Sequence, residues 1–300
     1  MAENIIFAYL ASSGKSVKEA CILTKSIRDF AGKYSNNSIW VLVPDNGKGI
    51  PETTKDELQS LNARLIPFQV HRSIWGFPFA TKVYASAVAE EMTEDQADLL
   101  LWMDTHAMVI NDPHEIILTP EKSLGYRPVD HTLIGSRYSE PIDAFWELIY
   151  RECDVREEKL FAMTSSVEDF EIRPYFNAGF VVTKPDKGLF RLWRDNFNRL
   201  FKEKKLEDFY QQDIRYKIFM HQAVMTGTIL ANFKKAEMKE LPYRVNYPLH
   251  MHRDYPVERR PKCLNDLTTV RYENFFDNTN WESIIPVKEP LGTWLEEQLF

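Results

Sequence analysis

The sequence predicts an α/β fold: a mostly parallel central sheet with helices on both faces, in a single large domain. Apolar runs of strand length alternate with segments in which apolar residues recur at helical spacing. The strand Ile5 to Leu10, the helix Lys15 to Ala31 and the strand Ile39 to Val43 form a first strand–helix–strand unit. The run from Leu99 to Met103 is apolar throughout, as in a strand buried on both faces.

The remaining elements follow in chain order. Gly32 stands where a glycine ends a helix, directly after the first helical segment. A short helix and the strand Arg64 to Phe68 come next, and a second amphipathic helix begins near Phe77. The later segments predict a strand at Thr132 to Ser136, a helix at Ile142 to Tyr150, a strand at Phe180 to Val182, a helix at about Lys187 to Lys204 and a strand at Leu241 to Tyr247.

Composition and charge exclude several classes of protein. The chain has 300 residues, of which 44% are hydrophobic and 27% charged, as in an ordinary globular protein. Its net charge of -7 argues against broad binding to nucleic acid or to anionic membranes. Three cysteines far apart predict neither a disulfide framework nor a cysteine zinc site. We find no membrane-spanning segment and no signal-peptide pattern, so we expect a cytoplasmic protein.

A Gly-Lys-Ser sequence follows the first strand, within Ser12-Ser13-Gly14-Lys15-Ser16. It resembles the end of a phosphate-binding P-loop, but that motif needs a second glycine five positions earlier, where Tyr9 stands. A capped turn is the simpler interpretation. Such a turn places backbone N–H groups at a helix N-terminus, so we expect Tyr9 and Ser12 to lie against a bound nucleotide.

The strand Leu99 to Met103 ends in two residues that can bind ions. Asp104 and His106 are two positions apart, so an extended backbone would point both side chains the same way. Ligands of open α/β sheets bind at the carboxyl ends of the strands, and these two residues could share one cation or one phosphate there. Lys82 lies near a helix start, where the helix dipole disfavours a cation, which suggests an anionic partner.

This Asp104-Thr105-His106 corner resembles the metal-binding Asp-X-Asp corner of the GT-A glycosyltransferases, the nucleotide-diphospho-sugar transferases with a Rossmann-like sheet. His106 replaces the second Asp. The segment Phe176-Asn177-Ala178-Gly179 is similar to a Phe-Asn-Ala/Ser-Gly segment of family-8-like members, whose Asn contacts the sugar region. The chain looks most similar to a bacterial or archaeal branch of that family.

Three further segments carry the same resemblance. Gln222 matches the Gln of an Asp-Gln pair on a helix near the transferred sugar, while His221 replaces the Asp. The segment from Leu241-Pro242 to Asn246 looks like a Leu-Pro…Asn strand of the family. Arg271 stands where many members carry a metal-binding His near the C-terminus, and His250 or His252 could replace that ligand.

The resemblance implies transfer of a sugar from a nucleotide-diphospho-sugar donor to an acceptor hydroxyl. It implies one GT-A-like domain over residues 1–300, with a nucleotide-binding half at about 1–115 and an acceptor and sugar half at about 116–300. Two ways of binding the donor phosphates remain open. In one, Asp104, His106 and His250 hold Mn²⁺ or Mg²⁺. In the other, a protonated His106 joins Lys82 and Arg271 and no metal is needed.

Around the sugar we expect Asn177, His221 and Gln222. An inverting reaction would need a general base, for which His221, Asp213 and Asp130 are the candidates. An alternative function is a catalytically degenerate GT-A domain that binds a nucleotide, a sugar or a protein partner without turnover. A metal hydrolase built on His106, His250 and His252 ranks last, because the chain has no motif such as HExxH.

Overall fold

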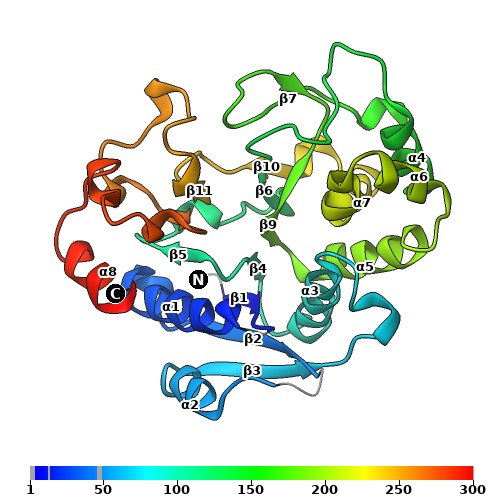
Figure 1. The fold of residues 1–300 in the computed structure, drawn as a ribbon. Coiled ribbons are helices and arrows are strands. Elements are labelled where there is room, and N and C mark those ends of the chain that lie inside the picture. Colours follow the sequence, from blue (N-terminus) through cyan, green and yellow to red (C-terminus); the bar gives the residue numbers. More distant parts are fainter. Residues whose placement is uncertain (1–3, 13, 46–48, 300) are drawn as a thin grey trace.

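The centre of the molecule is a seven-stranded sheet, seen in a computed structural model that describes residues 4–12, 14–45 and 49–299 (Figure 1). From one edge to the other its strands are β10 (Met238–Glu240), β6 (Leu124–Pro128), β9 (Phe176–Thr183), β4 (Leu99–Met103), β1 (Ile5–Leu10), β2 (Ser38–Pro44) and β3 (Ala63–Phe68). Strand β9 runs antiparallel to its neighbours β4 and β6, and the other neighbours pair in parallel. The predicted mostly parallel sheet is therefore confirmed.

Two smaller sheets lie outside this one. The first contains β11 (Tyr247–Pro248), β12 (Thr269–Arg271) and β5 (Ala107–Val109), and the second contains β7 (Met163–Thr164) and β8 (Glu171–Ile172). Strand β12 runs antiparallel to β5, with Arg271 opposite Ala107. This pairing brings a segment from late in the chain next to the turn that follows β4.

Helices cover both faces of the central sheet. They are α1 (Lys15–Phe30), α2 (Glu52–Ser60), α3 (Ala80–Thr93), α4 (Ala144–Glu152), α5 (Leu189–Leu200), α6 (Lys205–Gln212), α7 (Ile214–Asn232) and α8 (Leu291–Leu299). Figure 1 shows α1 and α8 on one side of the sheet and α3 and α5 on the other. The ring of Trp294 in α8 meets that of Phe30 in α1 at 5.2 Å. Across the described residues, no helix is both long and apolar enough to cross a membrane.

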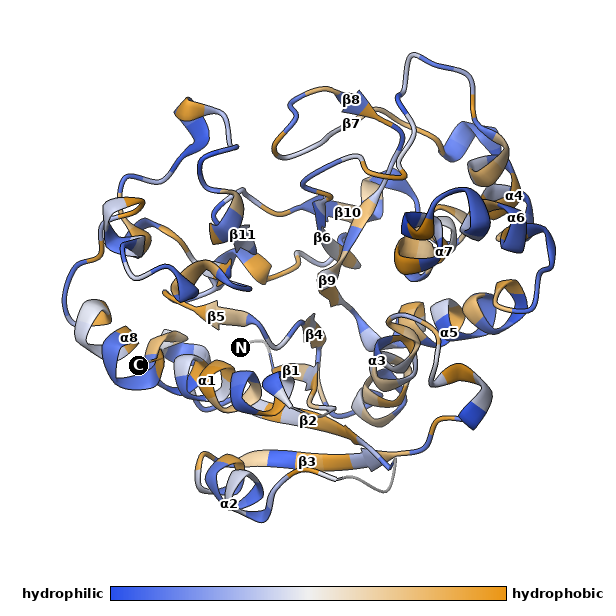
Figure 2. Ribbon diagram, viewed as in Figure 1, coloured by the Kyte–Doolittle hydropathy of each residue, from blue (hydrophilic) through white to orange (hydrophobic). Residues whose placement is uncertain are grey.

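The inner strands of the central sheet, such as β1, β4 and β9, are buried on both faces, so their side chains divide between two cores. In β1, Ile6 and Ala8 belong to the core beneath α3, α5 and α7, whereas Phe7 and Tyr9 belong to the core beneath α1. Accordingly, the ribbon of β2 is hydrophobic along most of its length (Figure 2). This double burial explains the continuous apolar runs by which these strands are recognised in the sequence.

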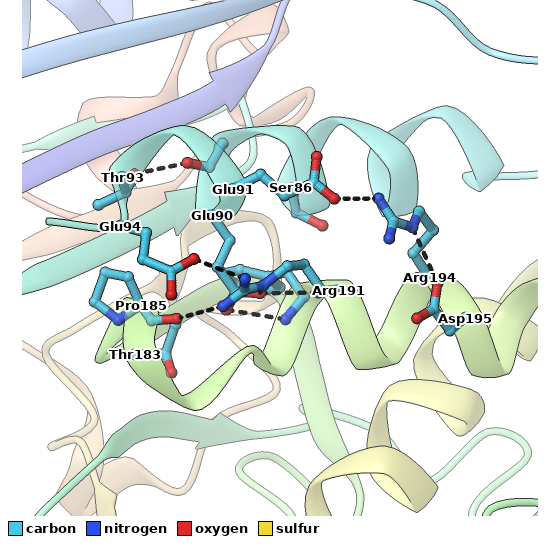
Figure 3. A network of polar contacts seen from close by, with 12 residues as sticks. Ser86, Glu90, Glu91, Thr93, Glu94, Thr183, Pro185, Arg191, Arg194 and Asp195 are labelled. Atoms are coloured by element: carbon cyan, nitrogen blue, oxygen red, sulfur yellow. Dashed lines mark hydrogen bonds and ion pairs between the residues drawn. The ribbon is translucent and has the colours of Figure 1, made fainter. Parts of the chain in front are cut away.

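A carboxylate from α3 replaces the missing cap of α5. The residue before α5 is Gly188, which has no side chain to accept from the first backbone N–H groups. Glu90, fully buried, accepts from the backbone N–H groups of Phe190 at 3.1 Å and Arg191 at 2.9 Å (Figure 3). The Arg191 guanidinium also pairs with Glu94 at 2.8 Å. Burial raises the pKa of Glu90 to about 7, although the hydrogen bonds from Arg191 and Phe190 oppose the shift.

Four sequence expectations differ from the structure. No strand forms at Thr132 to Ser136; the strand of this region is β6, whose Gly125, Arg127 and Pro128 conceal it in the sequence. The segment from Leu241 to Tyr247 is not one strand, because Pro242 and the left-handed Asn246 separate β10 from β11. The helices α3 and α5 begin later than expected, after Phe79 and Gly188, both with positive φ. The Phe176 to Gly179 segment lies inside β9 rather than before it.

Candidate functional site

The candidate site lies at the carboxyl end of β4, where the chain turns towards β5. The backbone N–H of Asp104 donates to the carbonyl of Gly179 at 2.9 Å, which ties this turn to β9. Two cavities, of ≈ 280 and ≈ 500 Å³, meet at a shared wall formed by Phe79, Lys82, Asp104 and His106. Three of these four residues are candidates from the sequence, so the structure brings them together as expected.

An ion pair forms the centre of the shared wall. The Lys82 ammonium lies 2.7 Å from Oδ1 and 2.8 Å from Oδ2 of Asp104, and Lys82 is only 7% exposed. Burial alone would raise the pKa of Asp104, but the charge of Lys82, with a contribution from Arg271, holds it below its ordinary value. Asp104 is therefore an anion with both oxygens already engaged by a cation.

Gly179 makes room for this carboxylate. A Cβ added at Gly179 would lie 2.6 Å from Oδ2 of Asp104 and 3.1 Å from Oδ1 of Asn177. Real side chains essentially never make the first of these contacts. A glycine within a strand often marks a close approach, and here the approaching group is a side chain of the protein itself.

A second buried cation faces the smaller cavity. Arg271, at the end of β12, is 9% exposed and pairs through Nη2 with Oδ2 of Asp130, which lines the same cavity. Its Nε–H is buried and has no hydrogen-bond partner among the described residues. A buried donor without a partner is costly in a folded protein, and it is readily explained by an acceptor that arrives with a ligand.

Two histidines and one carboxylate complete this wall. The Nε2 atoms of His106 and His250 lie 3.8 and 3.6 Å from Oε1 of Glu273, and Nη1 of Arg271 lies 3.7 Å from the same oxygen. Burial lowers the pKa of His106 and of His250, despite the opposing charges of Asp104 and Glu273. Both imidazoles are therefore neutral near pH 7, which disfavours the protonated His106 considered above.

Amide side chains line the opposite side of the smaller cavity. Oδ1 of Asn177 accepts from the backbone N–H of Gly179 at 2.8 Å, and Oε1 of Gln222 accepts from that of Ala178 at 3.0 Å. With both carbonyl oxygens turned to the backbone of β9, the amide nitrogens are the ends left to donate to a ligand. The helix α7 supplies Gln222 because it packs directly on β9.

His221 also lines this cavity, but its surroundings hold it neutral. Its Nδ1 lies 3.0 Å from the carbonyl of Ile218, and its ring stacks on Phe79 with centroids 4.6 Å apart. Burial, with a contribution from Lys82, lowers the pKa of His221 to about 3. Such a group is a poor general base at neutral pH, because it holds a proton only in strong acid.

The larger cavity lies beside the turn between β1 and α1. Its lining includes Ser12 from that turn, Ser16 and Glu19 from α1, and Trp75 from the loop before α3. Ser13, between the two serines, lies outside the described residues. Ser12 thus lines the larger of the two cavities that share this wall.

Three candidates lie elsewhere. Tyr9, which we expect to contact a bound nucleotide, has its side chain in the core under α1, where its hydroxyl bonds Thr24. In the described structure, Asp213 caps the start of α7 and does not line either cavity. His252 bonds the hydroxyl of Tyr247 through Nδ1, also away from both cavities.

Two residues of the site were not found from the sequence. Glu273 has a φ of 43°, a left-handed conformation that is uncommon for a residue other than glycine, and it follows Arg271 by two positions. Phe79 is 47% exposed, has a φ of 57° and lies on both cavities. No sequence pattern marks either residue, because the pairing of β12 with β5 and the loop before α3 place them.

Comparisons with known proteins identify the family. A family model described as a Rhodobacterales glycosyltransferase domain matches residues 7–231, whereas no curated protein matches. An active-site mutant of LgtC is similar in structure, with a TM-score of 0.50 and 14% identity over 89% of this chain and 86% of that one. That likeness shows the fold.

Two more solved structures are similar at lower scores. GlyE of Streptococcus pneumoniae TIGR4 has a TM-score of 0.47 and 13% identity, over 98% of this chain and 60% of that one. Mouse xyloside xylosyltransferase 1 has a TM-score of 0.48 and 10% identity, over 88% and 96%. The match to the family model covers most of the chain, so the protein belongs to the family of the Rhodobacterales glycosyltransferase domain and is a glycosyltransferase with the GT-A fold.

Proposed function

We propose that this glycosyltransferase takes its sugar from a nucleotide-diphospho-sugar and transfers it to an acceptor hydroxyl in the smaller cavity. The observation that carries the proposal is the meeting of two cavities at Lys82 and Asp104. One cavity lies beside the β1–α1 turn, where α/β sheets bind nucleotides, and the other is lined by the amides of Asn177 and Gln222. A ligand with a nucleoside at one end and a sugar at the other would cross the shared wall at its phosphates.

The chemistry needs positive charge at that crossing. When the bond from the sugar to the diphosphate breaks, negative charge grows on the phosphate oxygens, and fixed donors aimed at them lower the barrier. Lys82 and Arg271 are the buried cations that face this part of the site. Asn177 and Gln222 would donate to hydroxyl groups of the sugar and hold it in position for transfer.

Both predicted halves of the chain contribute residues to the site. Lys82, Asp104 and Ser12 come from the half at about 1–115, and Asn177, Gln222 and Arg271 come from the half at about 116–300. In our proposal the first half binds the nucleoside and the second binds the sugar and the acceptor. Among the three acidic residues that line the smaller cavity, Glu273 is the one whose carboxylate oxygens accept no hydrogen bond in the described structure, although its backbone carbonyl accepts from Lys15; its carboxylate is therefore best placed to receive the acceptor's proton.

The divalent cation that the resemblance implies does not fit the residues present. Both oxygens of Asp104 contact Lys82, and the Nε2 atoms of the other two expected ligands, His106 and His250, both face Oε1 of Glu273, which also pairs with Arg271. Within the described ranges, no group of three or more His, Cys, Asp or Glu side chains could hold a metal ion. Two like unit charges 4 Å apart repel each other by about 4 kcal/mol at an effective dielectric constant of about 20. The repulsion between a divalent ion and the Lys82 ammonium at that distance would be about twice as large.

A donor panel tests the proposed function. We would measure the melting temperature of the full chain with UDP-, GDP-, CDP- and dTDP-sugars, and the release of nucleoside diphosphate from each. A ligand that binds only the folded state raises the melting temperature by mass action, so at least one donor should raise it and should be cleaved slowly in water. If a donor binds but no nucleoside diphosphate is released, in water or with any acceptor tried, the result would contradict the proposed sugar transfer. It would favour a domain that binds its ligand without turnover.

A further inference from the structure

The side chains around Asp104 indicate how the phosphates of the donor are bound. This inference rests on the proposed function. In the family resemblance the corner carboxylate holds a divalent cation. Here the Lys82 ammonium contacts both oxygens of that carboxylate, at 2.7 and 2.8 Å. A protein cation thus occupies the place next to Asp104 that a bound ion would need.

Lys82 is held rigidly in that place. It lies in the first turn of α3 and is 7% exposed, and its ammonium lies 5.0 Å from the centroid of the Phe79 ring. An ammonium has three N–H donors, and Asp104 provides its hydrogen-bond acceptors among the described residues. Lys82 lines both cavities, so one donor remains for a ligand that passes between them.

Arg271 supplies a second fixed cation. A guanidinium stays charged at any physiological pH and presents its donors in a planar fork that suits phosphate oxygens. Nη2 is taken by Asp130, but the buried Nε–H has no partner in the described structure. Nδ1 of His250, on the same wall, is also buried without a partner among the described residues. The unpaired Nε–H of Arg271 indicates a ligand that brings a hydrogen-bond acceptor, such as a phosphate oxygen.

The carboxylate of Glu273 marks a position beside Arg271 that a negatively charged group can occupy. It lies 3.7 Å from Nη1 of Arg271 and 41% of its side chain is exposed, and its oxygens accept no hydrogen bond in the described structure. A phosphate oxygen can therefore replace it against Arg271 without breaking a hydrogen bond. Asp104 and Asp130, by contrast, are fixed by their cations and keep Lys82 and Arg271 oriented.

We propose that Lys82 and Arg271 bind the diphosphate of the donor in place of a divalent cation, so that donor binding does not depend on metal. The two side chains contribute two positive charges, the same number as one Mn²⁺ or Mg²⁺. Asp104 then acts as a positioning residue for Lys82 rather than as a metal ligand.

The first experiment uses the unmodified chain. We would titrate UDP, GDP, CDP, ADP and dTDP by calorimetry in excess EDTA and again in Mn²⁺. We expect at least one of them to bind, with a Kd that differs by less than about twofold between the two conditions. Binding that is lost in EDTA overturns the inference and leaves the proposed function standing. If none binds in either condition, the proposed function falls and the inference falls with it.

Variants of the two cations give the second experiment. In EDTA, Lys82→Met and Arg271→Met should each raise the Kd of the bound nucleotide by about tenfold to a hundredfold, as expected for loss of a hydrogen bond to a charged group. The matched control is Lys25→Met, which removes a lysine whose ion pair with Glu57 is equally short, 2.7 Å, on the other side of the sheet. Its Kd should equal that of the unmodified chain.

Folding of the variants is checked separately. Lys82→Met leaves Asp104 without its cation, so circular dichroism and the melting temperature are recorded for each variant. Lys82→Arg keeps the charge and should retain most of the affinity in EDTA, even if Lys82→Met fails to fold. A folded Lys82→Met with an unchanged Kd in EDTA, or a Lys82→Arg that binds only with Mn²⁺, overturns the inference.

Discussion

Gly179→Ala tests the geometry of the site without removing any functional group. The new Cβ would lie 2.6 Å from Oδ2 of Asp104, a distance at which something must move. The backbone cannot yield easily, because the carbonyl of Gly179 accepts from the N–H of Asp104 within the sheet. The carboxylate must therefore rotate, and its contacts with Lys82 are broken or lengthened.

The size of the effect follows from those contacts. Overpacking of a buried position costs about 1–3 kcal/mol, which lowers the melting temperature of a chain of this size by at least about 2 °C. Loss of a hydrogen bond to a charged group costs about 1.5–3 kcal/mol, so a Kd that depends on a correctly oriented Lys82 should rise by about tenfold or more. Differential scanning fluorimetry and calorimetric titration of the nucleoside diphosphate measure the two quantities.

Gly125→Ala is the matched control for this change. Gly125 lies on β6, next to β9, and the three atoms nearest to an added Cβ would be apolar, from Leu118 and Val182 at 3.3 Å and from Leu241 at 3.4 Å. We expect a loss of stability without a loss of affinity. Equal affinity in Gly179→Ala and Gly125→Ala would refute the argument that Asp104 positions Lys82 for the ligand.

Three further predictions concern other groups. Because the pKa of Glu90 rises from an ordinary 4.5 to about 7 on folding, the folded chain keeps a proton that the unfolded chain releases, and stability falls as pH rises through that window. In Glu90→Gln, the difference in the free energy of unfolding between pH 5 and pH 8, measured with urea, should be smaller by about 3 kcal/mol than in the unmodified chain. An unchanged difference would contradict the raised pKa of Glu90. Tyr9→Phe should lower the free energy of unfolding by about 1 kcal/mol and leave the affinity for nucleotide unchanged. Weaker binding would show that Tyr9 contributes to the nucleotide site. Asn177→Ala should reduce discrimination between sugars linked to one nucleotide, measured as a ratio of Kd values, more than it reduces affinity for the nucleoside diphosphate itself.

The elements that could be predicted from the sequence are those whose environment imposes a regular pattern. Strands β1, β2 and β4 are buried on both faces, so their apolar runs are continuous, and α1 has one apolar face and a glycine at its end. Strand β6 is equally buried, but it includes Arg127, whose guanidinium bonds Leu241 and Ser166 inside the protein. A buried arginine that finds its partners far away in the sequence cannot be recognised from local composition.

Some residues of the candidate site could likewise be predicted from the sequence, and others could not. Asp104, Asn177 and Gln222 stand in short segments that a resemblance can match, and the structure brings them to one cavity. Tyr9 lines neither cavity in the described structure, because successive residues of a strand alternate between its faces and the sequence does not say which face the site adjoins. Glu273 was missed because only the antiparallel pairing of β12 with β5 carries it there.

The late position of β12 also affects how the protein is made. A chain leaving the ribosome can pair β1 with β2 and β4 and fold α1 and α3 long before residue 271 is synthesised. Lys82 and Asp104 can then meet, but the guanidinium of Arg271 and its orphaned donor are still missing. A nascent chain can thus form the frame of its site before Arg271, the second of the two cations that we propose bind the donor phosphates, has been synthesised. On that proposal, full affinity for the donor comes only late in synthesis.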